Sequence, residues 1–276
     1  MFSLNDLTLL EAIERTWAEI RVGDVFGRAA QLAYFLFLAL FPFLICVIAS
    51  LSVFGTADRG RALLFHLFSS FLPGPAFQLI SNTFEQILQS GGPLKMSFGI
   101  IVALWSASLG MGAVMDTLNV AYQVKETRSL LKQYAVAVGL TSVFTVLVVV
   151  LVLLAVLGNE FVGESSAGNV THAGWIAVQS VLVLAGLLFV LAATYFLAPN
   201  LKTRQWRWIS PGAVAAIVLL AGVFAGFRIY LHYSGGYNSL YGSLGAVIVL
   251  LLCFYLSGIA VLSGGVLNAV LERGRD

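Results

Sequence analysis

Six long apolar stretches constrain this chain more than any other feature of its sequence. A helix needs about 20 predominantly apolar residues to cross the hydrocarbon layer of a bilayer. The six stretches lie at 30–54, 97–121, 134–158, 175–198, 209–231 and 243–270. Asp116 and Arg228 are the formal charges within them. The sequence therefore predicts an all-α fold, a polytopic bundle of six transmembrane helices that forms one integral membrane domain over residues 1–276.

The composition agrees with a membrane location. Hydrophobic residues make up 59% of the 276 residues and charged residues only 10%, whereas a soluble domain carries roughly 25% charged residues. So few charges could not cover the surface of a soluble protein of this length. The net charge of +2, from 15 basic and 13 acidic residues, is too balanced for a nucleic-acid groove. The bilayer is the expected partner, together with an unknown solute or lipid and a possible second copy of the chain.

The distribution of basic residues predicts the topology, because lysine and arginine concentrate in cytoplasmic loops. On one side of the membrane the expected spans leave only Arg59, Arg61 and Lys95. Eleven basic residues lie on the other side: Arg15, Arg21, Arg28, Lys125, Arg128, Lys132, Lys202, Arg204, Arg207, Arg273 and Arg275. Both termini are therefore expected in the cytoplasm.

Two segments outside the spans have amphipathic patterns. Residues 1–28 are expected to form a cytoplasmic helix, capped by Ser3 and Asp6. Its apolar positions lie on one helical face: Leu10, Ile13, Trp17 and Ile20. A helix that lies on anionic lipid is usually basic, whereas this one is acidic, so we expect it to pack against the cytoplasmic end of the bundle. Residues 55–96 are expected to form an extracytoplasmic pair of half-buried amphipathic helices.

Four polar residues at membrane depth form the candidate site: Asp116, Asn119, Asn268 and Arg228. A charge within a span costs at least about 2.5–3.5 kcal/mol near the bilayer centre, so such residues usually face the bundle interior. Asp116, Asn119 and Asn268 belong to spans that end on the cytoplasmic side, where they could line one polar site. Alternatively, Asp116 fixes helix packing and Arg228 extends to the outer headgroups.

Small and aromatic residues give two weaker signals around the fifth span. Gly222 and Gly226 are four residues apart, a spacing typical of tight helix contacts in membranes. The connection that follows is rich in glycine and tyrosine. It is expected to contribute to an interfacial aromatic belt, or to form a loop that enters the bundle.

Catalytic motifs are missing from the sequence. The three histidines, His66, His172 and His232, are isolated from one another, and no metalloprotease motif or phosphate-binding loop with its lysine is found. We therefore expect neither an enzyme nor a cofactor, and no catalytic or metal-binding residue.

Several short motifs resemble a known family. Residues 29–44 read AAQLAYFLFLALFPFL, with Pro42 inside the first span. Further along come WSAS at 105–108, DTLNVAY at 116–122, ETR at 126–128, WRWISPGA at 206–213, YGSLGAV at 241–247 and GVLNA at 265–269. This pattern, over roughly 29–272, resembles the YihY/BrkB family of bacterial inner-membrane proteins. The resemblance implies a fold more than an activity: members were once labelled ribonuclease BN, and some are described as virulence or serum-resistance factors.

Two classes of function are compatible with these observations. The first is a transporter or channel-like protein with a polar path between helices, favoured by the intramembrane charges and by Pro42, which frees a backbone carbonyl. The second is an envelope scaffold or lipid-handling protein that acts through partners. The ribonuclease label is disfavoured, because RNA cleavage needs metal-binding carboxylates or an acid–base pair.

Overall fold

The computed structural model describes residues 8–53, 81–82, 85, 93–163, 168–201, 210–233 and 237–273. In these ranges the chain forms seven helices and no strand, which confirms the all-α prediction. The helices are α1 (Leu9–Val22), α2 (Val25–Val53), α5 (Pro93–Ala121), α6 (Leu130–Gly163), α7 (Gly168–Leu197), α8 (Pro211–Tyr233) and α9 (Tyr237–Arg273). Most of the predicted 55–96 connection lies outside the described residues.

Within the described ranges, four helices are long and apolar enough to cross a membrane. Their apolar ranges are Leu130–Leu151, Gly174–Leu197, Pro211–Tyr230 and Val247–Arg273, in α6 to α9. The helices α1 and α2 meet at a bend of 65° and give a fifth range when they are counted together. The described residues thus support four or five of the six predicted spans by length and composition.

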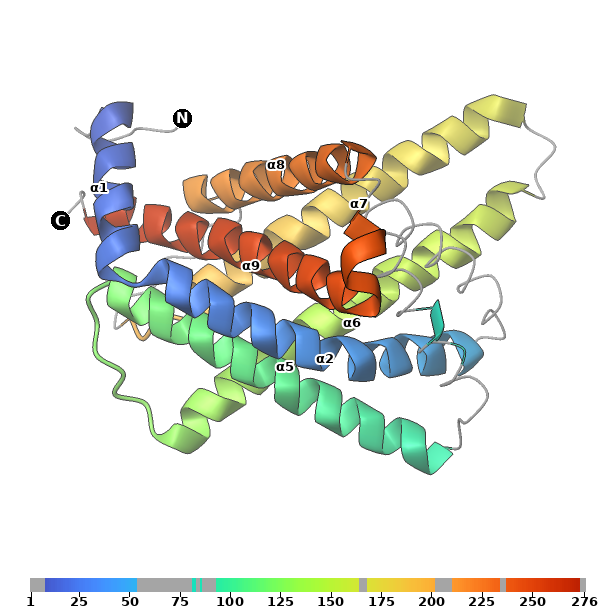
Figure 1. Ribbon diagram of the computed structural model, residues 1–276, viewed down its shortest axis with the longest axis horizontal. Helices are drawn as coiled ribbons and strands as arrows, with labels where there is room; N and C mark the ends of the chain where they lie inside the picture. Colours follow the sequence, from blue (N-terminus) through green and yellow to red (C-terminus); the bar gives the residue numbers. More distant parts are fainter. Residues whose placement is uncertain are drawn as a thin grey trace.

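The helices alternate in direction between two ends of an elongated bundle (Figure 1). One end, which we call the α1 end, carries α1, the starts of α2, α6 and α8, and the ends of α5, α7 and α9 (Figure 1). The helix α9 packs against α1, α2, α5, α7 and α8, and α2 packs closely against α5. The core is therefore built around α9, near the α1 end.

Glycines bring α8 and α9 into backbone contact near the α1 end. A Cβ atom on Gly212 would overlap the carbonyl oxygen of Gly264, and one on Gly264 would overlap the carbonyl oxygen of Gly212. Beside them, the Tyr195 hydroxyl donates a 2.6 Å hydrogen bond to the carbonyl oxygen of Val261. Only glycine permits this approach, so α8 and α9 are fixed here by their backbones.

The helix α1 presents a different face from the one expected. Thr8 caps it, with its side chain and that of Glu11 forming a capping box, whereas the predicted cap residues lie outside the described part. Ala12 and Ile20 are buried against the bundle, but Leu10, Ile13 and Trp17 are exposed. The helix packs against α9 and α2, as expected, but of its four apolar positions only Ile20 is buried, because the buried face is centred on the small and polar positions next to them.

Candidate functional site

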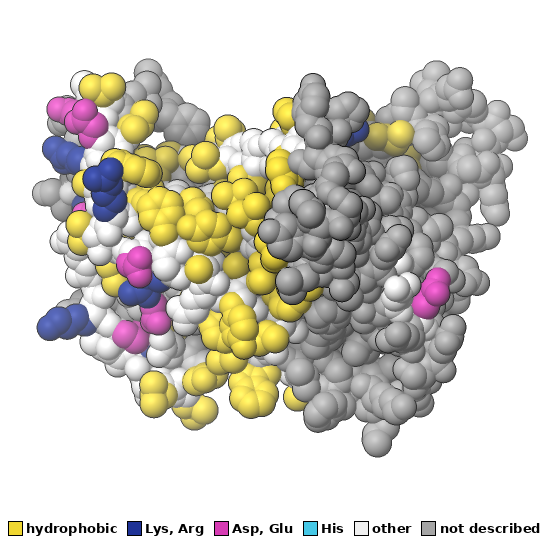
Figure 2. All heavy atoms as spheres, viewed as in Figure 1, with side chains coloured by type: hydrophobic (Ala, Val, Ile, Leu, Met, Phe, Trp, Pro, Cys, Tyr) yellow, Lys and Arg dark blue, Asp and Glu magenta, His cyan; other side chains and the backbone are white. Residues whose placement is uncertain are grey.

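Charged side chains gather at the α1 end of the described surface, and apolar side chains cover its middle (Figure 2). On this face, the described residues therefore concentrate their charged side chains at one end of the bundle. One partly buried and one buried polar cluster at this end include predicted site residues. We name them the Asn119 cluster (Asn119, Glu126, Arg128, Asn200) and the Asn268 cluster (Asn268, Ser210, Gly212).

The Asn119 cluster ties the α5–α6 connection to the end of α7. The Asn119 amide donates a 2.8 Å hydrogen bond to Glu126, and its carbonyl oxygen accepts one of 2.7 Å from the backbone N–H of Asn200. Arg128 forms a 2.7 Å ion pair with Glu126 and donates 2.7 and 3.3 Å bonds to the carbonyl oxygens of Ala198 and Leu197. The partial negative charge at the C-terminal end of α7 also stabilises a cation at this position.

The carboxylate of Glu126 is held in its ionised form. Hydrogen bonds from the Arg128 side chain are the largest cause, and with further bonds from the Arg128 backbone and Asn119 they lower the pKa of Glu126 to about 2, although partial burial acts to raise it. The Arg128 side chain is only 5% exposed. A buried guanidinium needs such a partner, because an unpaired buried charge is strongly destabilising. The pair therefore stabilises the connection.

The Asn268 cluster joins α9 to the first turn of α8. The side-chain oxygen of Asn268 accepts a 2.8 Å bond from the Gly212 N–H, and its amide donates a 2.8 Å bond to the Ser210 hydroxyl. Ser210 in turn accepts from the N–H of Ala213, as an N-cap residue does. Asn268 thus satisfies a helix N-terminal N–H that has no partner within its own helix.

The structure places the four predicted site residues in three environments. Asn119 and Asn268 are buried, at 5% and 4% exposure, and they hold opposite ends of the α7–α8 connection. Asp116 is exposed, and its carboxylate accepts a 3.5 Å bond from Gln133. Arg228 is also exposed, in the part of α8 that lies toward the opposite end (Figure 1). Asp116 and Asn119 have no hydrogen-bond partner in common, and one is exposed and the other buried, although they are three residues apart.

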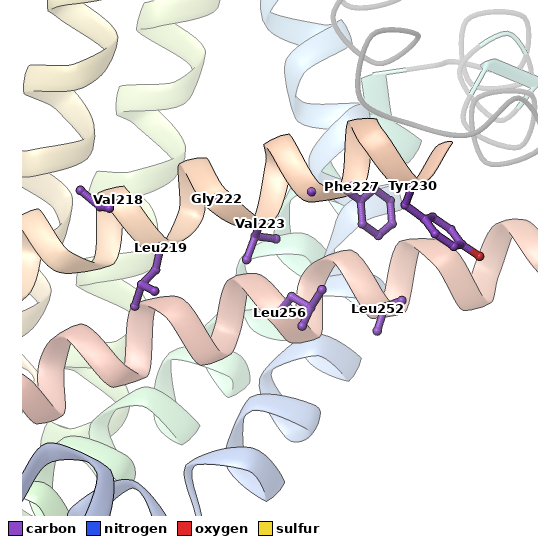
Figure 3. A pocket seen from close by; sticks show the side chains of 9 residues that line it. Val218, Leu219, Gly222, Val223, Phe227, Tyr230, Leu252 and Leu256 are labelled. Atoms are coloured by element: carbon purple, nitrogen blue, oxygen red, sulfur yellow. The ribbon is translucent and has the colours of Figure 1, made fainter. Parts of the chain in front are cut away.

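A groove between α8 and α9 lies in the apolar part of the bundle (Figure 3). Its volume is about 520 Å³. Nine residues line it: Val218, Leu219, Gly222, Val223, Gly226, Phe227, Tyr230, Leu252 and Leu256. The Tyr230 hydroxyl is the one polar side-chain atom among them, and Figure 3 shows it between the two helices at one end of the row. This lining fits a hydrocarbon chain and offers nothing to bind an ion.

Gly222 and Gly226 shape this groove and do not form the tight helix contact that their spacing predicted. A Cβ atom built on either glycine would have no neighbour within 4 Å. The close contact of α8 with α9 is made instead by Gly212 and Gly264, nearer the α1 end. Because the sequence spacing is the same whether a glycine faces a helix or open space, the sequence could not distinguish these roles.

Metal-binding geometry is not found in the described part of the chain, which holds no group of three His, Cys, Asp or Glu side chains suited to a metal ion. Sequence reasoning missed Asn200, Ser210 and Gly212 as partners of the two asparagines. The polar residues on either side of the α7–α8 connection could have indicated such partners, but only the fold shows which asparagine each of them is hydrogen-bonded to.

The bundle and its apolar groove define a multi-pass helical membrane protein. The chain belongs to the family described as virulence factor BrkB, whose model matches residues 16–276, as the sequence motifs predicted. A Bacillus subtilis (strain 168) protein described as ribonuclease-like, YfkH, is 36% identical over 254 residues, which are 90% of each chain.

Further relatives are named UPF0761 membrane proteins. One from Stenotrophomonas maltophilia (strain K279a) is 32% identical over 262 residues, which are 94% of this chain and 60% of that relative. One from Xanthomonas campestris pv. campestris (strain B100) is 27% identical over the same coverage. The chain thus spans about 60% of the length of these relatives. No solved structure matches the chain.

Proposed function

We propose that this chain is a transport protein of the bacterial inner membrane whose solute is amphipathic and lipid-like. The α8–α9 groove carries the proposal. Its volume of about 520 Å³ falls within the roughly 300–1,000 Å³ of small-molecule sites, and its lining suits an acyl or similar hydrocarbon chain. The Tyr230 hydroxyl at one end can meet the polar part of such a molecule.

An ion or a small polar solute is less well supported. The Asn119 and Asn268 amides already donate and accept hydrogen bonds within their clusters. Their hydrogen bonds link elements of the fold, and neither asparagine belongs to the α8–α9 groove. The described polar residues therefore support a structural role, whereas the groove supports a hydrophobic solute.

We further propose six spans with both termini in the cytoplasm. The helices α2 and α5 each have 29 residues, so each is about 43 Å long at 1.5 Å per residue, enough to cross. Most basic residues of the described ranges belong to the elements at the α1 end, a bias that the positive-inside rule associates with the cytoplasm, whereas Lys95 and Arg228 belong to the opposite end. The residues at the α1 end are Arg15, Arg21, Arg28, Lys125, Arg128, Lys132 and Arg273. A reporter that is active only in the cytoplasm, fused after residue 276, should be active. An inactive fusion of a well-expressed protein would refute this topology.

Transfer of a labelled lipid between leaflets tests the proposed activity. The purified full chain is reconstituted into vesicles that contain fluorescent phosphatidylglycerol, and an impermeant reductant destroys the label in the outer leaflet. With active protein, the inner-leaflet label should also be lost, faster than in protein-free vesicles. Transfer no faster than in protein-free vesicles would refute transport of this lipid class.

Two glycine positions provide the matched variants. Gly222→Leu with Gly226→Leu fills the groove, and because a Cβ there meets nothing within 4 Å, the backbone need not move. Gly139→Leu on α6 is the control, since a Cβ at Gly139 also meets nothing within 4 Å and lies outside the groove. The groove variant should lose lipid transfer while the control keeps it. Equal transfer by both variants would show that the groove is not the path.

A further inference from the structure

An exposed apolar edge runs along α1. Leu10, Ile13 and Trp17 are 69%, 64% and 49% exposed, and their spacing of three and four residues places them on one side of the helix. The side that packs against the bundle holds Ala12 and Ile20, which are 3% and 7% exposed. Three large apolar side chains that remain uncovered in a folded helix need a partner, since their burial is favourable by about 1.5–3 kcal/mol each.

The bend between α1 and α2 indicates what covers this edge. The two helices meet at 65°, so when α2 lies along the bilayer normal, α1 lies within about 25° of the membrane plane. Gly23 and Asp24 form the break, and Asp24 has a positive φ of 49°. The helix α1 therefore runs along the end of the bundle and does not continue α2 out of the membrane (Figure 1).

Aromatic and basic side chains lie where α1 meets α2. Trp17 contacts Phe26 of α2 edge to face, with ring centroids 6.2 Å apart, and the Arg21 guanidinium lies 5.2 Å from the Trp17 ring centroid. Phe26 is itself exposed on α2, so the apolar edge of α1 continues onto the side of a proposed span. Tryptophan beside arginine at such a junction is typical of the headgroup level of a bilayer.

We propose that α1 is an interfacial helix, whose edge of Leu10, Ile13 and Trp17 lies in the boundary between headgroups and acyl chains of the leaflet at the α1 end. The partner is the lipid surface itself. The charge of α1 differs from that of basic helices that bind anionic lipid electrostatically. Its acidic residues Glu11, Glu14 and Glu19 outnumber Arg15 and Arg21, and Glu19 forms a 2.7 Å ion pair with Arg273. Contact with lipid therefore depends on apolar burial and not on anionic headgroups.

Depth-dependent quenching tests the proposal on the full chain in vesicles. In a background of Cys46→Ala and Cys253→Ala, a polarity-sensitive fluorophore is attached to Ile13→Cys, and in a second protein to Ala18→Cys, an exposed position on another side of α1. Spin labels near the headgroups of the lipids should quench the probe at position 13 several-fold more than the probe at 18. A water-soluble quencher should show the opposite order. Replacing zwitterionic lipid with anionic lipid should leave the quenching at both positions unchanged.

Two results would overturn the proposal. If the aqueous quencher reaches both positions equally, the apolar edge faces water. If neither quencher reaches position 13, protein covers the edge, and cross-linking between Ile13→Cys copies would show whether a second chain does so. As a folding check, a third protein without either new cysteine should run as the same species by size-exclusion chromatography.

Discussion

Replacing Asn268 with alanine should destabilise the protein more than the loss of ordinary interhelical hydrogen bonds. Asn268 is 4% exposed and joins α9 to α8 through two 2.8 Å hydrogen bonds. The Gly212 N–H lies in the first turn of α8, where no backbone carbonyl of the helix can accept from it. The adjacent backbone of Gly264 lies against Gly212, which leaves little room for water or another side chain to replace the lost acceptor.

The expected size follows from these contacts. An unsatisfied buried N–H costs about 1–3 kcal/mol, and the bond to Ser210 contributes about 1 kcal/mol. The free energy of unfolding should therefore fall by about 2–4 kcal/mol. In membrane proteins where a freed group finds another partner, an interhelical bond averages only about 0.6 kcal/mol. The two values are far enough apart to be separated by experiment.

Equilibrium unfolding in mixed micelles, titrated with a denaturing detergent, measures the difference. The control is Asp116→Asn, near the same end of the bundle, where the exposed carboxylate accepts a 3.5 Å bond; its effect should stay within about 0.5 kcal/mol. Ser210→Ala tests the other half of the cluster and should also destabilise. A loss of about 0.6 kcal/mol or less for Asn268→Ala would refute the reasoning.

Three further predictions concern other parts of the molecule. Because the pKa of Glu126 is about 2, below its ordinary 4.5, the ionised carboxylate stabilises the folded protein fully above pH 4.5, and this stabilisation is lost as the pH falls toward 2. The difference in unfolding free energy between wild type and Glu126→Gln should therefore shrink from pH 4.5 to pH 2. A difference that stays constant over this range would contradict the prediction. Gly264→Ala should lower the unfolding free energy by about 1–3 kcal/mol through overpacking, whereas Gly222→Ala, with open space around its Cβ, should not lower it. Pure protein should leave single-stranded and structured RNA intact, and cleavage that co-purifies with it would restore the nuclease hypothesis.

The positions of the helices could be predicted from the sequence because the length and hydropathy of an apolar segment depend only on the residues of that segment. The expected stretch at 175–198 corresponds to α7 at Gly168–Leu197, and the one at 209–231 to α8 at Pro211–Tyr233. Pro211 marks the start of α8, as proline suits a first helical turn. Membrane helices of this kind can thus be located without knowledge of their neighbours.

The packing faces could not be predicted in the same way. A helix that is apolar on all sides has no periodic pattern to show which side meets protein and which meets lipid. Gly212 contacts α9 and Gly222 does not, although both are glycines of α8. For the same reason, Asp116 and Asn119 could be placed at one end of α5 but not assigned to their partners, which are Gln133 for Asp116 and both Glu126 and the distant Asn200 for Asn119.

The ion pair between Glu19 and Arg273 has a consequence for how the protein is made. The two residues are 254 positions apart. At a synthesis rate of roughly 5–20 residues per second, Arg273 is therefore added about 13–50 s after Glu19. During this interval α1 lacks the surface of α9 that buries its inner side. The bilayer next to the nascent chain is available at once, and a helix with an apolar edge can remain there until the ribosome has delivered α9.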